Sequence, residues 1–312
     1  MELRLFDLHC DTPTSLYGKC ASLEKNDLHV SLERASAFSR YVQVMAIWTQ
    51  HAMPDSTGFA NFHKVTDYLM NEFERLEDKV SFVRTSKGFD AVAPNKTAAF
   101  LAIEDARILA GVPDRLRVLY ARGVRFLTPV WAGESCIGGA HDTDVGLTEF
   151  GKQVMRDCFD MGIVPDLSHC SFQTAEDIFD IANEYGKPVI ATHSDSYAVC
   201  PHSRNLRDDQ FEAIKKSGGI VGICLCPSHL ATDAKKASLN DIIKHIEHYC
   251  SLGGEDTVAM GSDLDGTDLP DGFASVADLA KVANELARLN YQDTLIDKIF
   301  FANAERFIKG NL

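Results

Sequence analysis

The sequence predicts an α/β fold of the (β/α)8 (TIM) barrel type, as found in metal-dependent hydrolases. Short apolar runs recur along the chain with helix-like segments between them, which is the pattern of alternating strands and helices. A parallel barrel gathers the C-terminal ends of its strands in one place, so ligands far apart in sequence can meet there. Six potential metal ligands stand at the ends of such runs: His9, Asp11, Glu104, His169, His193 and Asp263.

Eight apolar runs are expected to be core strands. They are rich in Val and Ile and show little alternation with polar residues, which is typical of parallel strands buried on both faces. The predicted strands are residues 3–9, 41–48, 98–104, 124–130, 163–168, 188–193, 219–226 and 257–263. No GxGxxG motif follows the first run, which argues against the main alternative, a doubly wound open sheet.

The segments between these runs carry the spacing of amphipathic helices. Apolar residues fall on one helical face in residues 59–75, 148–161, 174–185 and 241–249. Gly162 and Gly186 directly follow two of these segments, where a left-handed C-terminal cap favours glycine.

Several stretches exceed the minimal repeat. Residues 12–39, 81–96 and 132–146 are expected to be inserted segments, and long βα loops commonly shape a pocket. Residues 289–309 predict a helical tail that packs outside the barrel. Because no linker or repeat interrupts the chain, we expect residues 1–312 to form a single barrel domain.

Composition narrows the class of protein. The chain has 312 residues, of which 45% are hydrophobic, and its formal charge of −14 argues against binding to nucleic acid or to an anionic membrane. The start MELRLFDLHCDTP lacks the form of a signal peptide, and no apolar run approaches the roughly 20 residues that span a bilayer. Nine scattered cysteines cannot all pair with one another, which fits a reducing compartment. We therefore expect a cytoplasmic protein.

The first candidate ligands are His9, Asp11 and Glu104. Residues two apart in an extended chain point to the same side, so His9 and Asp11 could hold one divalent ion. Glu104 follows the apolar run AAFLAI, and a carboxylate at the end of a buried strand must be paired, protonated or metal-bound. Its two oxygens could bridge two ions.

His169 and His193 end two successive strand-helix units, IVPDLSH and PVIATH. Either histidine alone could be a satisfied core residue. Equivalent positions on neighbouring strands favour a shared site instead. Imidazole and carboxylate ligands suit zinc, and also manganese or cobalt.

Two further positions concern proton transfer and substrate binding. Asp263 closes VAMGSD, where it is either part of a Gly-Asp turn or a proton shuttle beside a metal-bound water; Asp265 could compete for that role. Arg204 and Asn205 lie in PHSRNLRDDQ. An arginine fork matches a carboxylate, and the alternative is a solvated loop arginine.

These motifs together resemble the membrane (renal) dipeptidase family of zinc peptidases. The resemblance rests on DLHCDTP at 7–13, AIED at 102–105, GLTEFGKQVMRDCFDMGIVPDLSHCS at 146–171, ATHS at 191–194, RNLRD at 204–208 and MGSDLDG at 260–266. It therefore runs through nearly the whole chain.

The resemblance implies a barrel with two zinc ions per chain, in a homodimer that hydrolyses small dipeptides, including some with a D-residue at the C-terminal position. A hydroxide bridging the metals would be the nucleophile. His9 and Asp11 would hold one ion, His169 and His193 the other, and Glu104 both. By the same resemblance, Asp263 would be the acid/base residue and Arg204 would bind the substrate carboxylate. Asn205, next to Arg204 in the sequence, is also expected to bind the substrate.

The chain departs from the family pattern at the end of the fourth predicted strand. Trp131 stands where these dipeptidases usually carry a histidine that steadies the oxyanion, and Asp105-Ala106-Arg107 stands where Gly-Gly-His is frequent. Trp131 is therefore expected to contact the substrate. The departure leaves two alternatives to dipeptide hydrolysis: a related binuclear metallohydrolase acting on another amide or an ester, and a metal-bound homologue without catalysis.

Overall fold

The computed structural model describes residues 2–50, 53 and 55–312. Within them, eight strands form one sheet, and neighbouring strands run parallel. The strands are β1 (Arg4–Cys10), β2 (Arg40–Trp48), β3 (Val80–Phe82), β4 (Thr97–Glu104), β5 (Val124–Thr128), β6 (Val164–Pro165), β7 (Val221–Ile223) and β8 (Val258–Met260).

The sheet curls into a closed barrel. Its hydrogen-bonded order is β6-β5-β4-β2-β1-β8-β7. Two parallel bridges, Asp166 to Ile190 and Ala191 to Val221, join β6 to β7 through the segment predicted as the sixth strand. The predicted (β/α)8 barrel is thus confirmed, and residues 190–191 take the place of one strand (a very short barrel stave) between β6 and β7. β3 pairs only with β4 and lies outside the ring.

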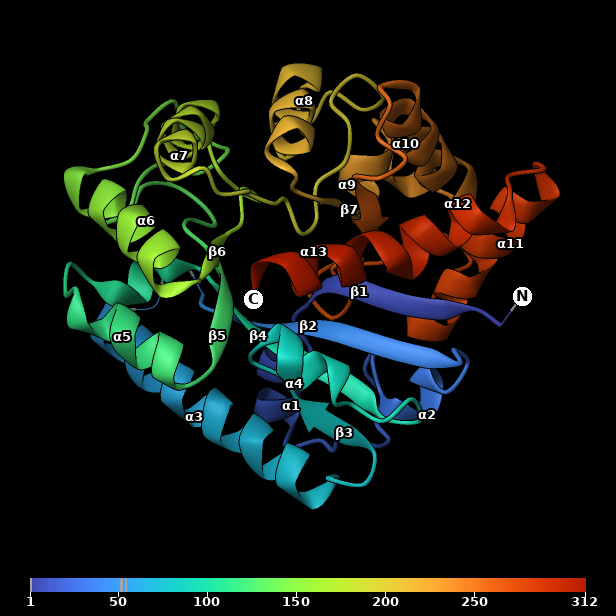
Figure 1. Ribbon diagram of the computed structural model, residues 1–312, viewed down its shortest axis with the longest axis horizontal. Coiled ribbons are helices and arrows are strands. Elements are labelled where there is room, and N and C mark those ends of the chain that lie inside the picture. The colour runs from blue at the N-terminus through green and yellow to red at the C-terminus, as the bar shows by residue number, and fades with distance from the viewer. Residues whose placement is uncertain (1, 51–52, 54) are drawn as a thin grey trace.

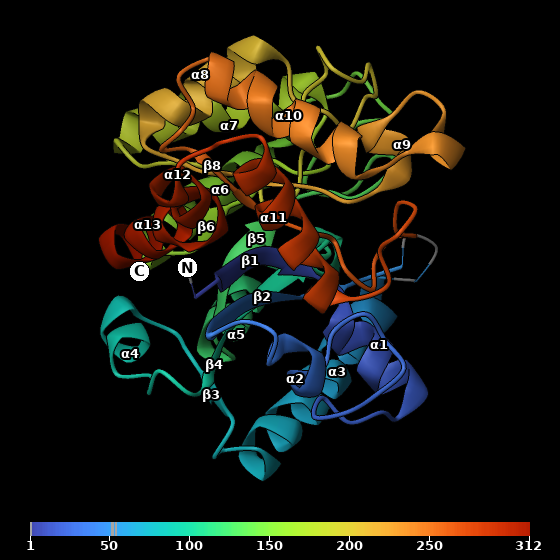
Figure 2. The same cartoon turned by 90° about the vertical axis from the view of Figure 1, so that its right-hand side faces the viewer.

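Helices surround the strands, as Figures 1 and 2 show. The longer ones are amphipathic and bury an apolar face, as the sequence pattern predicts. The α-helices are α1 (Thr12–Lys19), α2 (Leu32–Ala35), α3 (Asp55–Arg75), α4 (Ser86–Asp90), α5 (Asp114–Ala121), α6 (Glu149–Met161), α7 (Phe172–Tyr185), α8 (Asp208–Ser217), α9 (Pro227–Leu230), α10 (Leu239–Ser251), α11 (Ala280–Arg288), α12 (Asp293–Asp297) and α13 (Asn303–Asn311). Short 3₁₀ segments are η1 (Ala106–Leu109), η2 (Ala234–Lys236) and η3 (Val276–Leu279), and η4 (Lys298–Ala302) is a π-helical turn.

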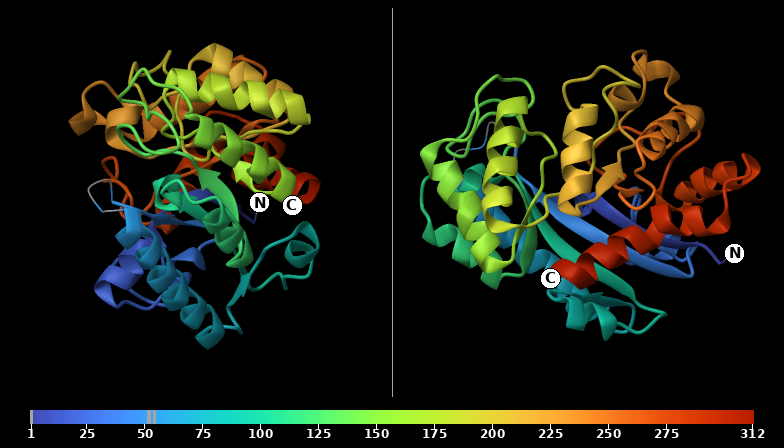
Figure 3. Two further views of the ribbon diagram at one scale, coloured as in Figure 1. Left: turned by 90° about the vertical axis from the view of Figure 1, so that its left-hand side faces the viewer. Right: turned by 45° about the horizontal axis from the view of Figure 1, so that its top comes forward.

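The C-terminal tail lies outside the ring of strands, and its apolar side chains close one end of the core. The rings of Phe301 and Phe307 are buried in one cluster with Phe6 and Phe100 of the strands. Arg4, at the start of β1, stacks on Phe301 at 4.1 Å from the ring centroid. Without the tail, the phenylalanines of the strands would be exposed to solvent at this end of the barrel. The apolar residues of η4 and α13 pack against them and bury them. Figures 1 and 3 show these red helices running along β1.

No helix in the described part of the chain is long and apolar enough to cross a membrane.

Candidate metal centre and active site

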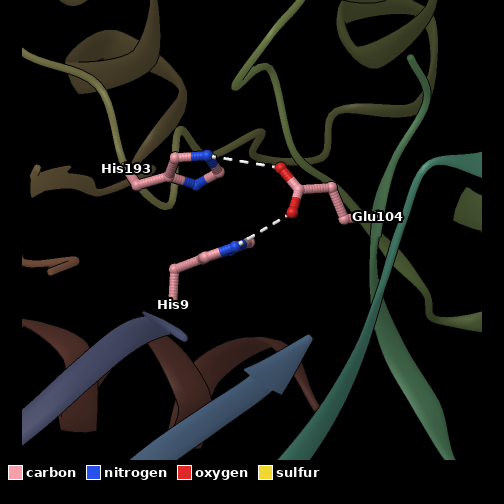
Figure 4. Close-up of side chains that lie close together, drawn as sticks. All are labelled: His9, Glu104 and His193. Atoms are coloured by element: carbon pink, nitrogen blue, oxygen red, sulfur yellow. Dashed lines mark ion pairs between the residues drawn. The ribbon is translucent and has the colours of Figure 1, made fainter. Parts of the chain in front are cut away.

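The carboxylate of Glu104, the last residue of β4, lies at the centre of the ligand cluster (Figure 4). Its Oε2 is 3.2 Å from Nε2 of His9. Its Oε1 is 2.8 Å from Nε2 of His169 and 3.4 Å from Nε2 of His193. One carboxylate therefore faces a single imidazole with one oxygen and a pair of imidazoles with the other.

Asp11 and Asp263 complete the His9 side of this cluster. The nearest oxygen of each carboxylate lies 4.0 Å from Nε2 of His9. β1 ends at Cys10 and Asp11 directly precedes α1, yet the two side chains share a side as the sequence predicts. Asp11 Oδ1 is buried and has no hydrogen-bond partner among the described residues. Buried polar atoms without partners are costly unless something else binds them.

Hydrogen bonds at the far sides of the rings fix which nitrogen atoms face the cluster. Nδ1 of His169 lies 3.1 Å from the carbonyl oxygen of Trp131, to which it can only donate. The hydroxyl of Thr192 donates to Asp166 and lies 2.8 Å from Nδ1 of His193, from which it can accept. A proton on each Nδ1 leaves an Nε2 lone pair facing inward.

The inward nitrogen atoms crowd one another. Nε2 of His169 is only 3.0 Å from Nε2 of His193, and both face the Glu104 carboxylate. Lone pairs and a carboxylate in such proximity repel unless protons or a cation lie between them. The donor set, imidazole nitrogen with carboxylate oxygen, fits zinc and neighbouring divalent metals.

Charge and burial shift the pKa values of the cluster residues in different directions. Burial lowers the pKa of His9, but the charges of Glu104 and Asp11 outweigh it and raise that pKa to about 10. Burial lowers the pKa of His169 to about 3, with a further contribution from the charge of Arg204. Burial opposes ionisation of Glu104, but His9 and His169 hold its pKa well below the usual range.

Asp263 has a pKa suited to proton exchange near neutrality. Burial raises this pKa, the charge of His9 opposes the rise, and Glu104 adds to it, so that the result is about 7. The backbone of Asp263 is left-handed, with φ of 58°. The carboxylate of Asp265 instead accepts hydrogen bonds from Thr12 Oγ1 at 2.6 Å and from the backbone of His29 at 2.6 Å. Geometry therefore separates the two aspartates: Asp263 faces the cluster, and Asp265 holds a loop.

Sequence reasoning missed two aspartates that support the site from behind. Asp166 accepts hydrogen bonds from Thr128 Oγ1 and from the backbone of Thr192, at 2.9 and 2.8 Å. Asp7 accepts a 2.8 Å hydrogen bond from the backbone of Ser262, next to Asp263. The sequence did offer a sign of both residues, because each is a charged residue inside a predicted apolar strand: Asp7 in residues 3–9 and Asp166 in residues 163–168.

A cavity of about 520 Å³ opens over the cluster. Ligand sites of small molecules are commonly of this size. Arg204 lines it and is 5% exposed; its Nη2 donates to the carbonyl of His193 at 3.3 Å, while its Nε has no hydrogen-bond partner among the described residues. His141, His202 and His229 also line this cavity.

Trp131 contributes both backbone and ring to the site. Its backbone N–H donates to Asp105 Oδ2 at 3.0 Å, and its backbone carbonyl accepts from Nδ1 of His169 and orients that ring. Its ring packs edge-on against Trp48, with 5.3 Å between centroids, and both line the cavity. The chain's two tryptophans thus form one aromatic wall; Trp48, at the end of β2, was not singled out from the sequence.

Asn205 is placed differently from Arg204. Its side-chain amide donates to the carbonyl oxygens of Cys200 and His229, both at 2.8 Å. These bonds tie the loop after residue 200 to α9. Asn205 is not among the residues that line the main cavity, so the structure brings Arg204 and Trp131 to it but not Asn205.

Comparison with known proteins now identifies the group to which the chain is related. Residues 1–311 match the sequence model of the membrane dipeptidase family, Peptidase family M19. The chain belongs to this family. A curated protein of Klebsiella pneumoniae, uncharacterized and encoded in the pqqA 5′ region, is 35% identical over 69% of this chain and 83% of its own. The dipeptidase aclJ of Aspergillus oryzae is 32% identical over 62% of this chain and 47% of its own.

Solved structures of metallopeptidases share the fold throughout. A metallopeptidase of family M19 described as dipeptidase AC has a TM-score of 0.92 at 25% identity, covering 100% of this chain and 99% of that one. A metallopeptidase from Rhodobacter sphaeroides, liganded with a phosphinate mimic of L-Ala-D-Ala, has a TM-score of 0.92 at 24% identity and covers 100% of both chains. Membership makes this chain a metallo-dipeptidase by family, with residues that could bind metal.

Proposed function

We propose that the protein is a dipeptidase with two zinc ions per chain. The observation that carries this proposal is the Glu104 carboxylate, which faces His9 with one oxygen and the His169–His193 pair with the other. We assign His9 and Asp11 to one ion, His169 and His193 to the second, and Glu104 to both. Manganese or cobalt would suit the same ligands.

Bound zinc ions would supply a Lewis acid for the scissile carbonyl and lower the pKa of the attacking water. Asp263 is our candidate for proton transfer. Its carboxylate faces the cluster, so it could accept a proton from that water and then donate it to the leaving amine. The 4.0 Å separation between Asp263 Oδ1 and His9 Nε2 supports this role, because it keeps the carboxylate beside the cluster.

Arg204 would bind the free carboxylate of the dipeptide. Its guanidinium is nearly buried in the cavity wall, and its Nε has no partner among the described residues. A substrate carboxylate has the negative charge and the two oxygen acceptors that match the guanidinium fork. The ligand of the Rhodobacter relative, a mimic of L-Ala-D-Ala, is the reason to propose that a D-residue is accepted at the C-terminal position.

Trp131 favours a second candidate, hydrolysis of another amide or an ester. An indole ring paired with Trp48 occupies the wall where a histidine donor would be expected from the family resemblance. Loss of one oxyanion donor costs about 100- to 1000-fold in rate. An activated ester or strained amide needs less oxyanion stabilisation than a peptide bond does.

The test combines metal analysis with a substrate panel. Zinc-loaded protein is assayed on L,L, L,D and D,D dipeptides, on their C-terminal amides and on the corresponding esters. At least two metals per chain with release of free amino acids supports the dipeptidase. At least two metals with inert dipeptides and cleaved esters or other amides supports the second candidate, and inertness toward the whole panel supports a non-catalytic homologue. Chelated protein is the control. A homodimer, also proposed from the family resemblance, is tested by sedimentation.

A further inference from the structure

A second cluster of potential metal ligands lies beside the first, in the segments that follow two neighbouring strands of the barrel. It consists of Asp195, Cys224 and His229. One carboxylate oxygen, the Cys224 sulfur and one ring nitrogen all lie within 4.8 Å of one another. Asp195 follows the stave at residues 190–191, Cys224 follows β7, and His229 belongs to α9. Asp195 and Cys224 are 0% exposed and His229 is 8% exposed.

We propose that Asp195, Cys224 and His229 form a further metal site, selective for a thiophilic divalent ion such as Zn²⁺. The mixed set of carboxylate, thiolate and imidazole is one that zinc accepts, with three protein ligands and a fourth position for water. The proposal is independent of the two-zinc centre, because none of its three residues belongs to that centre.

An unpartnered carboxylate oxygen points to a missing ligand. Oδ1 of Asp195 accepts a 3.1 Å hydrogen bond from the backbone of Cys224. Oδ2 is buried and has no hydrogen-bond partner among the described residues. A fully buried carboxylate needs such a partner or a cation.

The Cys224 sulfur and the His229 ring nitrogen are spaced as two ligands of one ion would be. Cys224 Sγ lies 3.7 Å from Nδ1 of His229, close to the separation of about 3.5 Å that tetrahedral Zn–S and Zn–N bonds would set. The backbone N–H of Cys226 also donates to this sulfur, at 3.4 Å. Hydrogen bonds to the sulfur are a usual feature of metal–thiolate sites. Binding would replace the thiol proton with the metal and release that proton to solvent.

The ligands are held in place by their neighbours. Ser194 N–H donates to the carbonyl of Gly222 at 2.9 Å, which ties the Asp195 segment to β7. The amide of Asn205 donates to the carbonyl of His229 at 2.8 Å and fixes α9. This gives Asn205 a positioning role. The site also adjoins Asp263, whose Oδ2 is 3.9 Å from Cys224 Sγ.

The test uses spectroscopy, because the two-zinc centre offers only nitrogen and oxygen ligands. Metal-free protein is titrated with Co²⁺, and a near-ultraviolet band from sulfur-to-cobalt charge transfer is recorded. We expect the band in the wild-type protein and in Cys226→Ser, the matched control, and its loss in Cys224→Ser together with one metal equivalent per chain. A band that persists in Cys224→Ser, or that disappears in Cys226→Ser alone, would overturn the proposal.

A second measurement requires no variant. In cadmium NMR of the metal-loaded wild-type protein, each bound ion gives its own resonance, and a sulfur ligand shifts that resonance strongly downfield. We expect one downfield resonance besides those of the nitrogen- and oxygen-ligated ions. Resonances confined to the nitrogen and oxygen range would refute this site and leave the two-metal centre standing. Absence of the latter resonances would refute the two-metal centre alone.

Discussion

At the scale of single residues, Asp263 is the sharpest test of mechanism. Asp263→Asn keeps the size of the side chain and one carbonyl oxygen but cannot exchange a proton near neutrality. Because His9, Asp11, Glu104 and the other two histidines are untouched, metal content should be unchanged while kcat falls by about 100- to 10,000-fold. Metal analysis and steady-state kinetics on one preparation measure both. A kcat within tenfold of the wild-type value would remove Asp263 from proton transfer.

Arg204 separates binding from chemistry. Arg204→Met removes the charge and retains much of the apolar stem, so substrates with a free carboxylate should lose a charge-assisted interaction worth about 1.5–3 kcal/mol. Their KM should rise about 10- to 100-fold, with little change for C-terminal amides. The matched amide series is the internal control. An equal rise for both series would show that Arg204 supports the cavity wall and does not bind the carboxylate.

The residues that could be predicted are those whose chemistry depends on position along a strand. His9, Glu104, His169 and His193 end apolar runs, and the barrel brings those ends together whatever the details of packing. The supporting residues were harder. Whether Asp166 or Thr192 serves the site depends on hydrogen bonds across strands, which no local pattern encodes.

At the scale of elements, the loop after β8 brings two carboxylates close to one glycine. A Cβ on Gly266 would overlap Oδ2 of Asp11 and Oδ1 of Asp263. Gly266→Ala should therefore displace both carboxylates and lower metal affinity about 10- to 100-fold, similar to other changes around metal ligands. Equilibrium dialysis with zinc measures this.

Gly18→Ala is the matched control for that change. Gly18 lies in α1 with open space around its position, and alanine in a helix is more stable than glycine by about 0.5–1 kcal/mol. Metal affinity should therefore be unchanged in this variant. Wild-type affinity in Gly266→Ala would mean that the loop can move away without disturbing either carboxylate.

The shortest staves mark the limit of element prediction. The segment at 188–193 was expected to be an ordinary strand, yet only single bridges at Ile190 and Ala191 join it to its neighbours. β3 was not expected, because three residues carry too little periodicity to be distinguished from a loop. Apolar runs predict where the barrel strands lie. How many residues of each strand pair with its neighbours depends on how the barrel closes.

At the scale of the whole molecule, the C-terminal tail should contribute strongly to stability. Phe301 is fully buried against Phe6 and beneath Arg4. Phe301→Ala should lower the free energy of unfolding by about 3–5 kcal/mol, the usual cost of removing a buried phenylalanine ring. Urea unfolding measures it, with Phe172→Ala, which is 42% exposed on α7, as the control. A loss below about 1 kcal/mol would mean that the tail only rests on the barrel.

Metal loading should couple the whole protein to pH through His9. Its pKa of about 10 means that metal-free protein carries a proton on His9 at neutral pH. A pKa raised above the ordinary value of 6.5 stabilises the metal-free fold, and this contribution is complete at pH values below 6.5. It is lost as the pH rises toward 10, because His9 then loses its proton in the folded state too. Zinc must displace the proton, so apparent affinity and metal-dependent stabilisation should both increase with pH across this window.

Calorimetric titration of metal-free Cys224→Ser protein with zinc tests this coupling, in two buffers of different ionisation enthalpy at the same neutral pH; the substitution removes any proton that the Cys224 thiol would release. The observed heats should differ by the enthalpy of the protons released. His248→Gln is the control, because His248 pairs with Asp208 near the surface and should release none of them. Heats independent of buffer would mean that His9 is already neutral before the metal binds, and the ion pair between His9 and Glu104 would then not describe the metal-free state.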